Sequence, residues 1–400
     1  MKILGIETSC DETALCVIEA TGDIKTPETL AFRVLGNELL SQINIHAQYG
    51  GVFPAIAKRE HSKALIPLLE TILKEIKLEK TEIKIDPEKQ KRIEKILERE
   101  LELKEIFLER INKIQKPDID AIAVTYGPGL EPALWVGINF AKALSIAWDI
   151  PIIPTNHMEG HIVSSLTNKI DWGNNIKTEE NDNITFPAIA LLISGGHTEL
   201  VSVTEWAKYK IIGSTKDDAV GEAFDKVARI LGLPYPGGPA ISQMATEARV
   251  DKPQATPIYN LPSPMIHSND FDFSFSGLKT AVLYTVKKIP EITDEIKKDI
   301  AREFEDAVIK VLLAKAKKAL IATGAKSLII GGGVSANKEI RKAFQNLAKE
   351  LGINISIPNH LLSTDNAVMI AIAGYIQAES ATHNQDSFGA LGNLKLGKQE

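Results

Sequence analysis

The sequence contains only two cysteines, Cys10 and Cys16, in 400 residues, which excludes a disulfide framework and suits a reducing compartment. Aromatic residues are also scarce, at 6%, whereas hydrophobic residues of all kinds make up 44% and charged residues 24%. These fractions are typical of a globular chain and exclude an intrinsically disordered one. At this length we expect two or three domains, and we expect both cysteines to be buried strand residues.

Long apolar runs are missing as well. The most apolar stretch, 132–154, is interrupted by Lys142, Asp149 and Pro151, and it falls short of the roughly 20 residues that a membrane span needs. Near the start, Glu7 places a carboxylate where a secretory signal needs its apolar core. We therefore expect a cytoplasmic protein with no transmembrane helix.

The chain also lacks an excess of positive charge. It has 46 Lys and Arg against 52 Asp and Glu, so the formal net charge is −6, which excludes whole-molecule attraction to a polyanion. Any nucleic-acid contact must use a local basic patch, although basic residues at this density are more often a solvated surface. The candidates are Lys58 with Arg59, Lys279, Lys287 with Lys288, and Arg341 with Lys342.

Two patterns occur twice along the chain. An apolar run, a polar turn and a second apolar run at 3–18 predict a β-hairpin, and the same pattern returns at 188–203. In each half, a short apolar strand then leads into a glycine turn, a helix and another strand, at 121–154 and at 327–357. This order predicts two α/β lobes that face one another across a ligand-binding cleft. A single α/β domain with incidental glycine turns is the alternative.

The repeat also predicts the domain boundaries. We expect an N-terminal α/β lobe at 1–165, a polar connecting loop at 166–186, and a C-terminal α/β lobe at 187–400. The extreme C-terminal segment is expected to pack back on the N-terminal lobe.

One segment, 74–116, does not fit the repeat, since 24 of its 43 residues are charged. Asp86 has the character of a helix N-cap and is followed by Pro87, so we expect one long helix from Asp86 onward. This charged helical insertion would be a solvated surface element or, alternatively, an arm that binds a partner.

Two histidines point to a metal site. His157 and His161 lie four residues apart in a predicted helix, so they project from one face and can share one metal ion. Asp365, at the start of another helical run, is the best candidate for a third ligand. The alternative is a pair of ordinary core or surface histidines. Glu159 does not directly follow the first histidine, so it should point away from the metal, and we reject a zincin peptidase mechanism.

Glycine turns at 194–196 and 331–333 predict a nucleotide site, because missing Cβ atoms let backbone N–H groups approach phosphate oxygens. Either turn alone is more often a plain turn, and neither matches a P-loop. Asp225, on a predicted helix, is placed to accept ribose hydroxyls or is part of a solvated helix face. Gly238 would let a sugar or base lie close to the backbone, and Asn337 follows the second turn.

The ordered motifs together resemble those of one family. The segments that carry the resemblance are 6–13, 157–161, 194–198, 221–226, 236–239, 272–279, 331–337 and 363–366. They are similar to the motifs of the tRNA N6-adenosine threonylcarbamoyltransferase family, and the resemblance covers nearly the whole chain. The opening motif, from Ile6 to Thr13, resembles the bacterial and mitochondrial branch, and we expect the bacterial type.

The resemblance implies a fold and an activity. The fold is the duplicated α/β fold of actin, hexokinase and the heat-shock chaperone ATPases, with a nucleotide- and metal-binding cleft. The activity is an acyl transfer from threonylcarbamoyl-AMP to N6 of the adenosine 3′ of the anticodon, in tRNAs that read codons beginning with A, with release of AMP. The alternatives are a metal-dependent glycoprotein endopeptidase, which the position of Glu159 disfavours, and a non-catalytic ATP-binding scaffold.

The resemblance also implies roles for individual residues. His157, His161 and Asp365 match the metal ligands, while Asp11 and Glu12 match acidic residues near the reacting group. We expect Asp11 to be the general base, because the exocyclic amine must lose a proton as the new bond forms. The positions that match the nucleotide or threonylcarbamoyl site are Leu192, Ile193, Ser194, Gly195, Gly196, Asp225, Gly238 and Asn337.

We expect one divalent metal ion per subunit, with Fe²⁺ favoured over Zn²⁺, although two imidazoles and a carboxylate suit both ions. Regulatory binding of ATP or ADP in the cleft stays open. By resemblance, the partners are tRNA, threonylcarbamoyl-AMP from an upstream enzyme, an inactive paralogous subunit that dimerises with the transferase, and a small ATPase. No membrane partner is expected.

Overall fold

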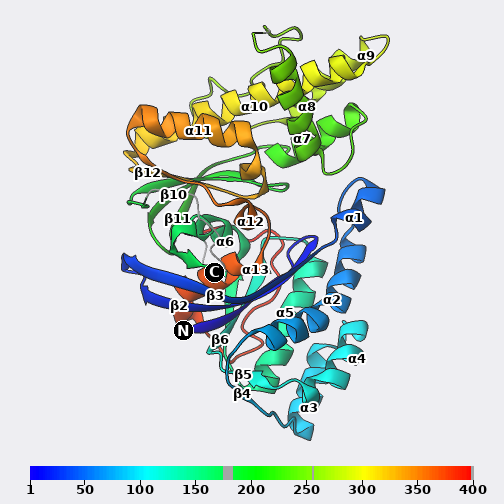
Figure 1. The fold of residues 1–400 in the computed structure, drawn as a ribbon, viewed down its shortest axis with the longest axis vertical. Coiled ribbons are helices and arrows are strands. Elements are labelled where there is room, and N and C mark those ends of the chain that lie inside the picture. The colour runs from blue at the N-terminus through cyan, green and yellow to red at the C-terminus, as the bar shows by residue number, and fades with distance from the viewer. Residues whose placement is uncertain (174–182, 255, 398–400) are drawn as a thin grey trace. The chain divides into compact units, whose positions relative to one another are not determined.

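The chain divides into two compact units in the computed structural model, which describes residues 1–173, 183–254 and 256–397. The first unit contains residues 1–180 and 365–400, and the second contains residues 181–364. Figure 1 shows their elements in chain order. The predicted second lobe at 187–400 therefore differs from this division, because the segment from residue 365 onward packs in the first unit.

The first unit is built on a six-stranded mixed sheet with the order β7-β6-β1-β2-β3-β8. Its strands are β1 (Lys2–Glu7), β2 (Glu12–Asp23), β3 (Thr26–Ser41), β6 (Ala121–Gly127), β7 (Ile152–Asn156) and β8 (Ile170–Asp171). Strands β1, β2 and β3 are antiparallel neighbours, while β6 pairs in parallel with β1 and β7 in parallel with β6. The predicted hairpin at 3–18 is confirmed, with Ile3 opposite Ile18.

Helices cover both faces of this sheet. The helices of the unit outside the insertion are α1 (Ile43–His46), η1 (Ala47–Tyr49), α2 (Pro54–Glu75), α5 (Glu131–Trp148), α6 (His157–Val163), η3 (Thr167–Lys169), α13 (Ala367–Ile376) and η5 (Ala378–Ser380). Side chains alternate along the strands, so Leu4 and Ile6 are buried in the core with α2 and α5. Gly5 faces the other way, where a Cβ atom would collide with the backbone carbonyl oxygen of Ala367 at the start of α13. This close packing explains why α13 belongs to the first unit.

The predicted connecting loop at 166–186 is only partly described. Its residues 174–182 lie outside the described part of the chain, whereas η3 and β8 form within its first residues. Strand β8 adds to the edge of the sheet, with Ile170 opposite Phe32 of β3. The start of the predicted loop is therefore part of the first unit's sheet.

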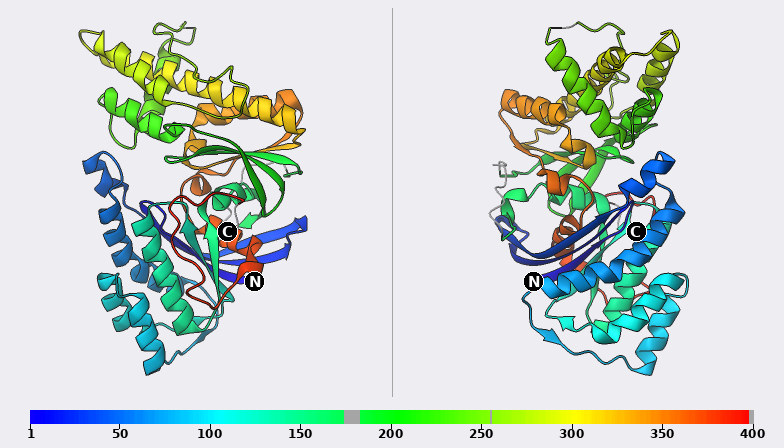
Figure 2. Two further views of the ribbon diagram at one scale, coloured as in Figure 1. Left: turned by 180° about the vertical axis from the view of Figure 1, so that it is seen from behind. Right: turned by 45° about the vertical axis from the view of Figure 1, so that its right-hand side comes forward.

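The charged insertion forms two helices rather than the one that we predicted. They are α3 (Pro87–Ile96) and α4 (Leu101–Arg110), followed by η2 (Ile111–Lys113), and a two-stranded ribbon of β4 (Lys80–Thr81) and β5 (Lys116–Pro117) closes their base. Figure 2 shows them from two further sides. The predicted N-cap is confirmed, since the Asp86 carboxylate accepts a hydrogen bond from the backbone N–H of Lys89.

The break between the two helices has a physical cause. Glu100 leaves the helical conformation, and its buried carboxylate lies 3.0 Å from Nζ of Lys58 on α2. The turn also folds the insertion back, so that α3 packs on α5 and α4 packs on α2. Both helices thereby bury apolar side chains, including Ile93 and Phe107, that one straight helix would carry away from the core.

The second unit contains a five-stranded sheet with the order β11-β10-β9-β12-β13. Its strands are β9 (Ala188–Ile193), β10 (Thr198–Glu205), β11 (Lys208–Ser214), β12 (Ser327–Gly331) and β13 (Asn354–Ser356). The predicted hairpin at 188–203 is confirmed, with Thr198 opposite Ile193. Strand β12 pairs in parallel with β9, and β13 in parallel with β12.

The two sheets have the same topology. In each, two antiparallel hairpin connections are followed by two parallel strands on the other side of the first strand, so β1, β2, β3, β6 and β7 correspond to β9, β10, β11, β12 and β13. Strand β8 is an addition to the first sheet. The predicted duplicated α/β fold is confirmed.

The second unit places its helical elements between β11 and β12 and around β13. They are α7 (Val220–Ile230), α8 (Gly237–Asp251), α9 (Ser276–Lys287), α10 (Asp294–Thr323), η4 (Gly333–Ala336), α11 (Lys338–Leu351) and α12 (His360–Ser363). The longest, α10, begins at the N-cap Thr293 and ends at Gly324, whose φ of 64° is accessible to glycine without strain. Its buried side chains join those of β9 and β12 in one apolar core.

Two expectations from composition can be compared with the structure. Both cysteines are free, and Cys16 is buried in β2 as expected, whereas Cys10 is half-buried in the turn before β2. Among the described residues, no helix combines the length and the hydropathy that a membrane span requires.

Candidate functional site

The three predicted metal ligands lie together in the first unit. His157 and His161 are on α6, which the side chain of Asn156 caps by accepting two backbone hydrogen bonds. Asp365 directly precedes Asn366, the N-cap of α13. Oδ1 of Asp365 lies 3.4 Å from Nε2 of His157 and 3.2 Å from Nε2 of His161. The three ligand atoms lie within 4.8 Å of one another, so one ion can contact all of them.

The cluster has the chemistry of a metal site. His161 is fully buried, and its ring nitrogens make no well-aligned hydrogen bond within the described residues, although Nε2 lies 3.2 Å from Oδ1 of Asp365. Leaving a buried polar atom unpaired costs free energy, and an ion between the three side chains would remove that cost at Nε2. Two imidazole nitrogens with one carboxylate oxygen form a donor set that suits Fe²⁺ or Zn²⁺. The residues present therefore fit the expected divalent ion.

Glu7 stands behind the cluster, and sequence reasoning missed it as a site residue. Its buried carboxylate accepts a hydrogen bond from Oγ1 of Thr125 at 2.6 Å and lies 3.1 Å from Nδ1 of His157. A carboxylate on Nδ1 fixes the ring and its tautomer and directs Nε2 toward the ion. The only signal in the sequence was a charged residue at the end of an otherwise apolar strand.

Charges in the cluster also favour a cation. Burial lowers the pKa of His157, but the carboxylates of Asp365 and Glu7 outweigh burial and hold that pKa well above its usual value. Burial raises the pKa of Asp365, but the imidazoles of His157 and His161 outweigh it and hold the pKa far below its usual range. Burial also lowers the pKa of His161. The directions for His157 and Asp365 show that the two carboxylates favour a positive charge between these side chains, while the lowered pKa of His161 favours the neutral ring that a metal ligand requires.

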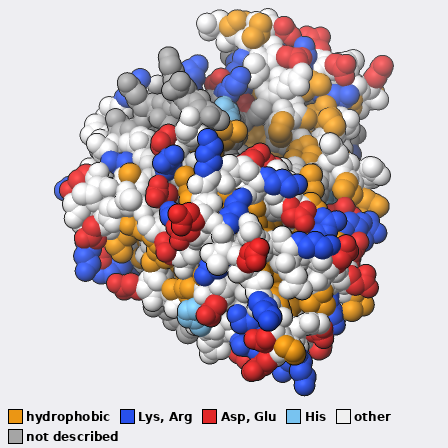
Figure 3. Space-filling model, turned by 60° about the horizontal axis from the view of Figure 1, so that its bottom comes forward, with side chains coloured by type: hydrophobic (Ala, Val, Ile, Leu, Met, Phe, Trp, Pro, Cys, Tyr) orange, Lys and Arg blue, Asp and Glu red, His pale blue; other side chains and the backbone are white. Residues whose placement is uncertain are grey.

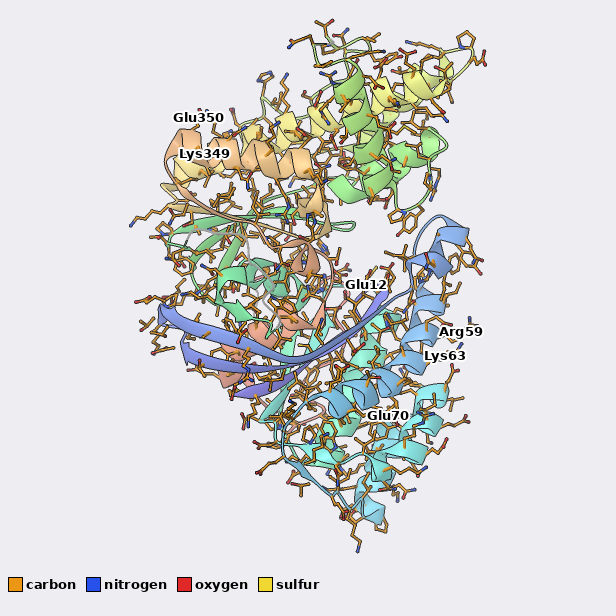
Figure 4. The ribbon with its side chains drawn as sticks, in the orientation of Figure 1. Glu12, Arg59, Lys63, Glu70, Lys349 and Glu350 are labelled. Carbon is orange, nitrogen blue, oxygen red and sulfur yellow. The ribbon has the colours of Figure 1, made fainter. Side chains whose placement is uncertain are left out.

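Asp11 and Glu12 lie in the turn between β1 and β2. Asp11 is buried, and its backbone carbonyl accepts a hydrogen bond from the backbone N–H of Gln42 at 2.9 Å. Glu12, which Figure 4 labels at the start of β2, accepts a hydrogen bond from Oγ of Ser41 at 3.3 Å. Burial raises the pKa of the Glu12 carboxyl well above its usual value, and the nearby charges of Asp365 and Asp11 raise it further. The first unit thus gathers Asp11, Glu12 and Asp365 in one acidic neighbourhood.

Glu159 is engaged elsewhere. Its two carboxylate oxygens accept hydrogen bonds from Nε2 of Gln377 at 3.0 and 3.1 Å. This contact agrees with the expectation that Glu159 points away from the ion, unlike the glutamate of a zincin peptidase.

The second unit contains a cavity of about 560 Å³, a size typical of small-molecule sites. Four of the eight predicted substrate residues line it: Gly195, Asp225, Gly238 and Asn337. The other four do not. Leu192 and Ile193 end β9 with their side chains fully buried, Ser194 accepts a hydrogen bond from the backbone N–H of His197, and Gly196 is exposed.

Three glycines form part of the cavity wall. A Cβ atom added at Gly195, Gly238 or Gly333 would meet no atom within 4 Å, so each position opens into space that a side chain would fill. Asp225 supports this wall, because its Oδ1 accepts a hydrogen bond from the backbone N–H of Gly237 at 2.7 Å. Burial raises the pKa of the Asp225 carboxyl. The cavity therefore offers bare backbone to a ligand.

A buried polar network beside the cavity was not found by sequence reasoning. Glu305 is 1% exposed, and its carboxylate accepts hydrogen bonds from Oγ of Ser242 at 2.8 Å and Nδ2 of Asn337 at 2.7 Å. Arg249 pairs with the same carboxylate. Apart from Asn337, which was predicted, these residues belong to no short motif and are far apart in the sequence, so nothing local signalled them. The acidic lining suits the hydroxyl and amino groups of a nucleoside.

Four of the seven predicted phosphate contacts have a protein partner, including Lys58, which pairs with Glu100, and Arg59, which pairs with Glu60. Arg341 is buried and donates hydrogen bonds to Oγ of Ser363 and the carbonyl of Pro358, so it is not a surface contact. Nζ of Lys279 lies 2.9 Å from Asp218. Lys287, Lys288 and Lys342 are exposed. On the face shown in Figure 3, basic and acidic side chains are interspersed, and neither sign forms a broad patch.

Solved structures with a similar fold have low sequence identity to this chain. The (R)-2-hydroxyglutaryl-CoA dehydratase component A of Acidaminococcus fermentans is 12% identical, with a TM-score of 0.43 over 95% of this chain and 99% of that one. HypF of T. kodakarensis is 14% identical, with a TM-score of 0.46 over 70% of this chain and 43% of that one. At these values we draw no inference about ligands or activity.

Sequence comparisons are far more specific. A model of the tRNA N6-adenosine threonylcarbamoyltransferase family matches residues 33–85 and 102–372. The enzyme of that name from Polynucleobacter necessarius subsp. necessarius (strain STIR1) is 41% identical over 401 aligned residues, which cover 98% of this chain and 96% of the relative. The gap in the family match falls within the charged insertion. The chain therefore belongs to the tRNA N6-adenosine threonylcarbamoyltransferase family.

Proposed function

We propose that this chain transfers the threonylcarbamoyl group of threonylcarbamoyl-AMP to N6 of the adenosine 3′ of the anticodon in tRNA, in the cytoplasm. The observation that carries this proposal is the buried cluster of His157, His161 and Asp365, with Glu7 behind it, in a chain of this family. An ATP-binding scaffold has no need for such a cluster.

His157, His161 and Asp365 would hold one divalent ion, and we favour Fe²⁺ over Zn²⁺. When bound, the ion supplies a Lewis acid for the carbonyl of the carbamoyl group. Glu7 keeps the His157 ring in the orientation that presents Nε2 to the ion. Elemental analysis of the purified protein would identify the metal.

The reaction forms a bond between N6 and the carbamoyl carbon and breaks the bond from that carbon to a phosphate oxygen, so AMP leaves with the bonding electron pair. N6 must lose a proton as this happens, and we assign its acceptance to the carboxylate of Asp11. We assign Glu12, in the same turn, to the surroundings of the reacting group. If the Asp11→Asn variant kept the full transfer rate at saturating substrate, the assignment of Asp11 would be wrong.

We assign the nucleotide portion of the adenylate to the cavity of the second unit. The bare backbone at Gly195 and Gly238 supports this assignment, as do the nearby side chains of Asp225 and Asn337. The segment 192–196 would contribute through its backbone, since its first two side chains are buried. ATP or ADP would compete for the same cavity, so direct titration with AMP, ADP and ATP would rank them.

The test is mass spectrometry of tRNA nucleosides from a bacterial strain depleted of its own transferase and expressing this chain. Restored threonylcarbamoyladenosine is the expected result. The paralogous subunit and the small ATPase that we expect as partners would come from the host, so a purified reaction with threonylcarbamoyl-AMP and tRNA, with and without these proteins, is the second arm. No product in either arm, from folded and metal-loaded protein, would overturn the proposal.

A scaffold would behave differently from a transferase when the metal ligands are removed. Replacing His157 and His161 with alanine should abolish turnover while nucleotide binding in the second unit continues. Turnover that survives this double replacement would contradict a role for the cluster in the transfer.

A further inference from the structure

Exposed apolar side chains gather in one short segment of the first unit. Among the described residues, twelve large hydrophobic side chains are exposed, and five of them lie within residues 39–53. They are Leu39, Leu40, Ile45, Tyr49 and Phe53. A cluster of exposed apolar side chains marks a binding site more often than a single exposed apolar residue does.

Two of these side chains form an aromatic platform, by which we mean Tyr49 at the end of η1 and Phe53 before α2. Tyr49 is 57% exposed and Phe53 is 55% exposed. Their ring centroids lie 5.8 Å apart with an interplanar angle of 45°, so the two rings contact each other while more than half of each residue's surface stays exposed. A third exposed aromatic residue, Tyr284, lies on α9 of the second unit.

The aromatic platform is joined to the turn that carries Asp11 by a chain of hydrogen bonds. The backbone N–H of Phe53 donates to Nδ1 of His46 at 3.3 Å, so the ring proton of His46 is on Nε2, which lies 3.1 Å from Oε1 of Gln42. The backbone N–H of Gln42 then donates to the carbonyl of Asp11 at 2.9 Å. His46 and Gln42 are buried, so this link is shielded from water.

A second buried group strengthens the link. His61 on α2 accepts a hydrogen bond at Nδ1 from Oγ1 of Thr13 at 2.7 Å, and its Nε2 donates to the carbonyl of Cys10 at 3.0 Å. Gln42 also approaches the His61 ring, with Nε2 3.3 Å from Nδ1. The platform and the turn are therefore joined through several buried side chains within the first unit.

Basic side chains follow the platform along α2. Arg59 and Lys63 are 60% and 43% exposed, and Figure 4 shows them on the same side of the helix. Both pair with Glu60, at 3.1 and 3.2 Å, so two positive charges share one negative charge and one positive charge is in excess. The excess positive charge beside exposed aromatic rings favours a ligand that carries several negative charges and also has flat apolar surfaces.

We propose that Tyr49 and Phe53 stack unpaired bases of the tRNA anticodon loop, with Arg59 and Lys63 on its phosphates. The proposal rests on the proposed function, because that reaction takes place on an adenine of this loop. Proteins that read RNA loops stack the splayed bases on exposed aromatic side chains, and the contact tolerates different bases. The hydrogen-bonded link would hold the stacked loop at a set distance from Asp11.

The test is binding of a fluorescently labelled anticodon stem-loop RNA to the full chain, followed by fluorescence anisotropy. The Y49A/F53A variant should bind about 10- to 100-fold more weakly, as expected for the loss of one or two stacking contacts. The Y49F/F53Y variant keeps both rings and should bind within about twofold of the original chain. Y284A is the matched control, because it removes an equally exposed aromatic ring from α9, and its affinity should not change.

Thermal melting and metal content establish that each variant is folded, and Y49A alone serves if the double variant is not. Equal RNA binding by the original chain and Y49A/F53A, or no binding by the original chain, would overturn the proposal. Unchanged RNA binding together with lost association with a paralogous subunit would overturn it in favour of a protein surface. A third outcome would separate the two proposals. If the chain bound RNA through the aromatic platform but transferred no threonylcarbamoyl group, the proposed function would be contradicted, whereas the proposed role of the platform in RNA binding would be supported.

Discussion

The two units share a strand topology, yet the chemistry at corresponding strand ends is different. Strand β1 ends at Glu7 and leads into an acidic, largely buried turn, whereas β9 ends at Ile193 and leads into an open turn with Gly195 and Gly196. Helix α6, which follows β7, carries two buried histidines. The short helix α12, which follows β13, carries one histidine, His360, at its first position, and this residue is exposed. One backbone pattern thus carries a cluster of candidate metal ligands in one unit and a glycine-lined cavity in the other.

This difference shows which properties come from the fold and which from the side chains. Topology brings strand ends together, and the residues that follow each strand decide what binds there. We therefore expect each unit to hold its ligand with its own residues. Four experiments test this expectation.

The largest effect is expected for His161→Ala. Loss of a metal ligand should empty the site and reduce transfer by more than about 100-fold, since even the second shell of a metal site commonly contributes 10- to 100-fold. Elemental analysis and single-turnover kinetics measure the two effects. His383→Ala, an exposed histidine of the same unit, is the control. If His161→Ala also abolished nucleotide binding, the separation between the two units would fail.

The next effect concerns the buried polar network of the first unit. Burial lowers the pKa of His61 from 6.5 to about 4, helped by His46 and opposed by the Cys10 carbonyl and Glu7. The unfolded chain takes up this proton below pH 6.5 and the folded chain does so only near pH 4. Neutral His61 therefore stabilises the fold fully above pH 6.5, and about 3 kcal/mol is lost as the pH falls toward 4.

Urea unfolding of the original chain and His61→Gln at pH 7.5 and pH 4.5 measures this contribution. Glutamine does not titrate, so the variant, although less stable at neutral pH, should lose less stability on acidification. If both proteins lost the same free energy of unfolding between pH 7.5 and pH 4.5, groups other than His61 would be responsible for the acid sensitivity.

Glu7→Gln should weaken metal binding by about 10- to 100-fold, because the amide is a poorer partner for Nδ1 of His157 than the carboxylate. Glu19→Gln is a matched control in β2, since Glu19 is a partly exposed carboxylate in a weak pair with Arg33. Competition with a metal chelator measures both affinities. Unchanged metal affinity in Glu7→Gln would mean that His157 needs no support from Glu7.

The smallest effect comes from two neighbouring glycines in the second unit. A Cβ atom at Gly238 enters open cavity, so Gly238→Ala should remain stable and bind AMP about fivefold more weakly, as one crowded methyl group implies. At Gly237 the same atom would lie 2.6 Å from Cα of Asp225, so Gly237→Ala should lower the melting temperature instead. If Gly238→Ala instead bound AMP normally and Gly237→Ala lost AMP binding without a change in melting temperature, the nucleotide would not occupy this cavity.

Periodicity predicted what depends on neighbours in sequence. Both hairpins, the strand and helix that follow each glycine turn, and the spacing of His157 and His161 depend on residues a few positions apart, and the structure has each of them. The N-cap at Asp86 also depends only on neighbouring residues, so this prediction was confirmed, although the prediction of one long helix after it was wrong.

What sequence reasoning missed depends on distant partners. The break at Glu100 is explained by Lys58, 42 positions earlier, and the support for His157 by Glu7, at the other end of the unit's chain. Arg341 is indistinguishable in the sequence from a solvated basic residue, and only the fold shows that it is buried. The sequence analysis expected only the extreme C-terminal segment to pack on the first lobe, and the earlier start of this return, at residue 365, depends on the packing of α13 against β1.

The return of the chain to the first unit at residue 365 has a consequence for synthesis. A ribosome makes this protein from the N-terminus, and the two histidine ligands emerge some two hundred residues before Asp365, the third. During that interval the first unit also lacks α13, which covers one face of its sheet. A nascent chain therefore cannot bring the three candidate ligands together until the second unit has been translated, so a chain that terminates early lacks the third member of the cluster.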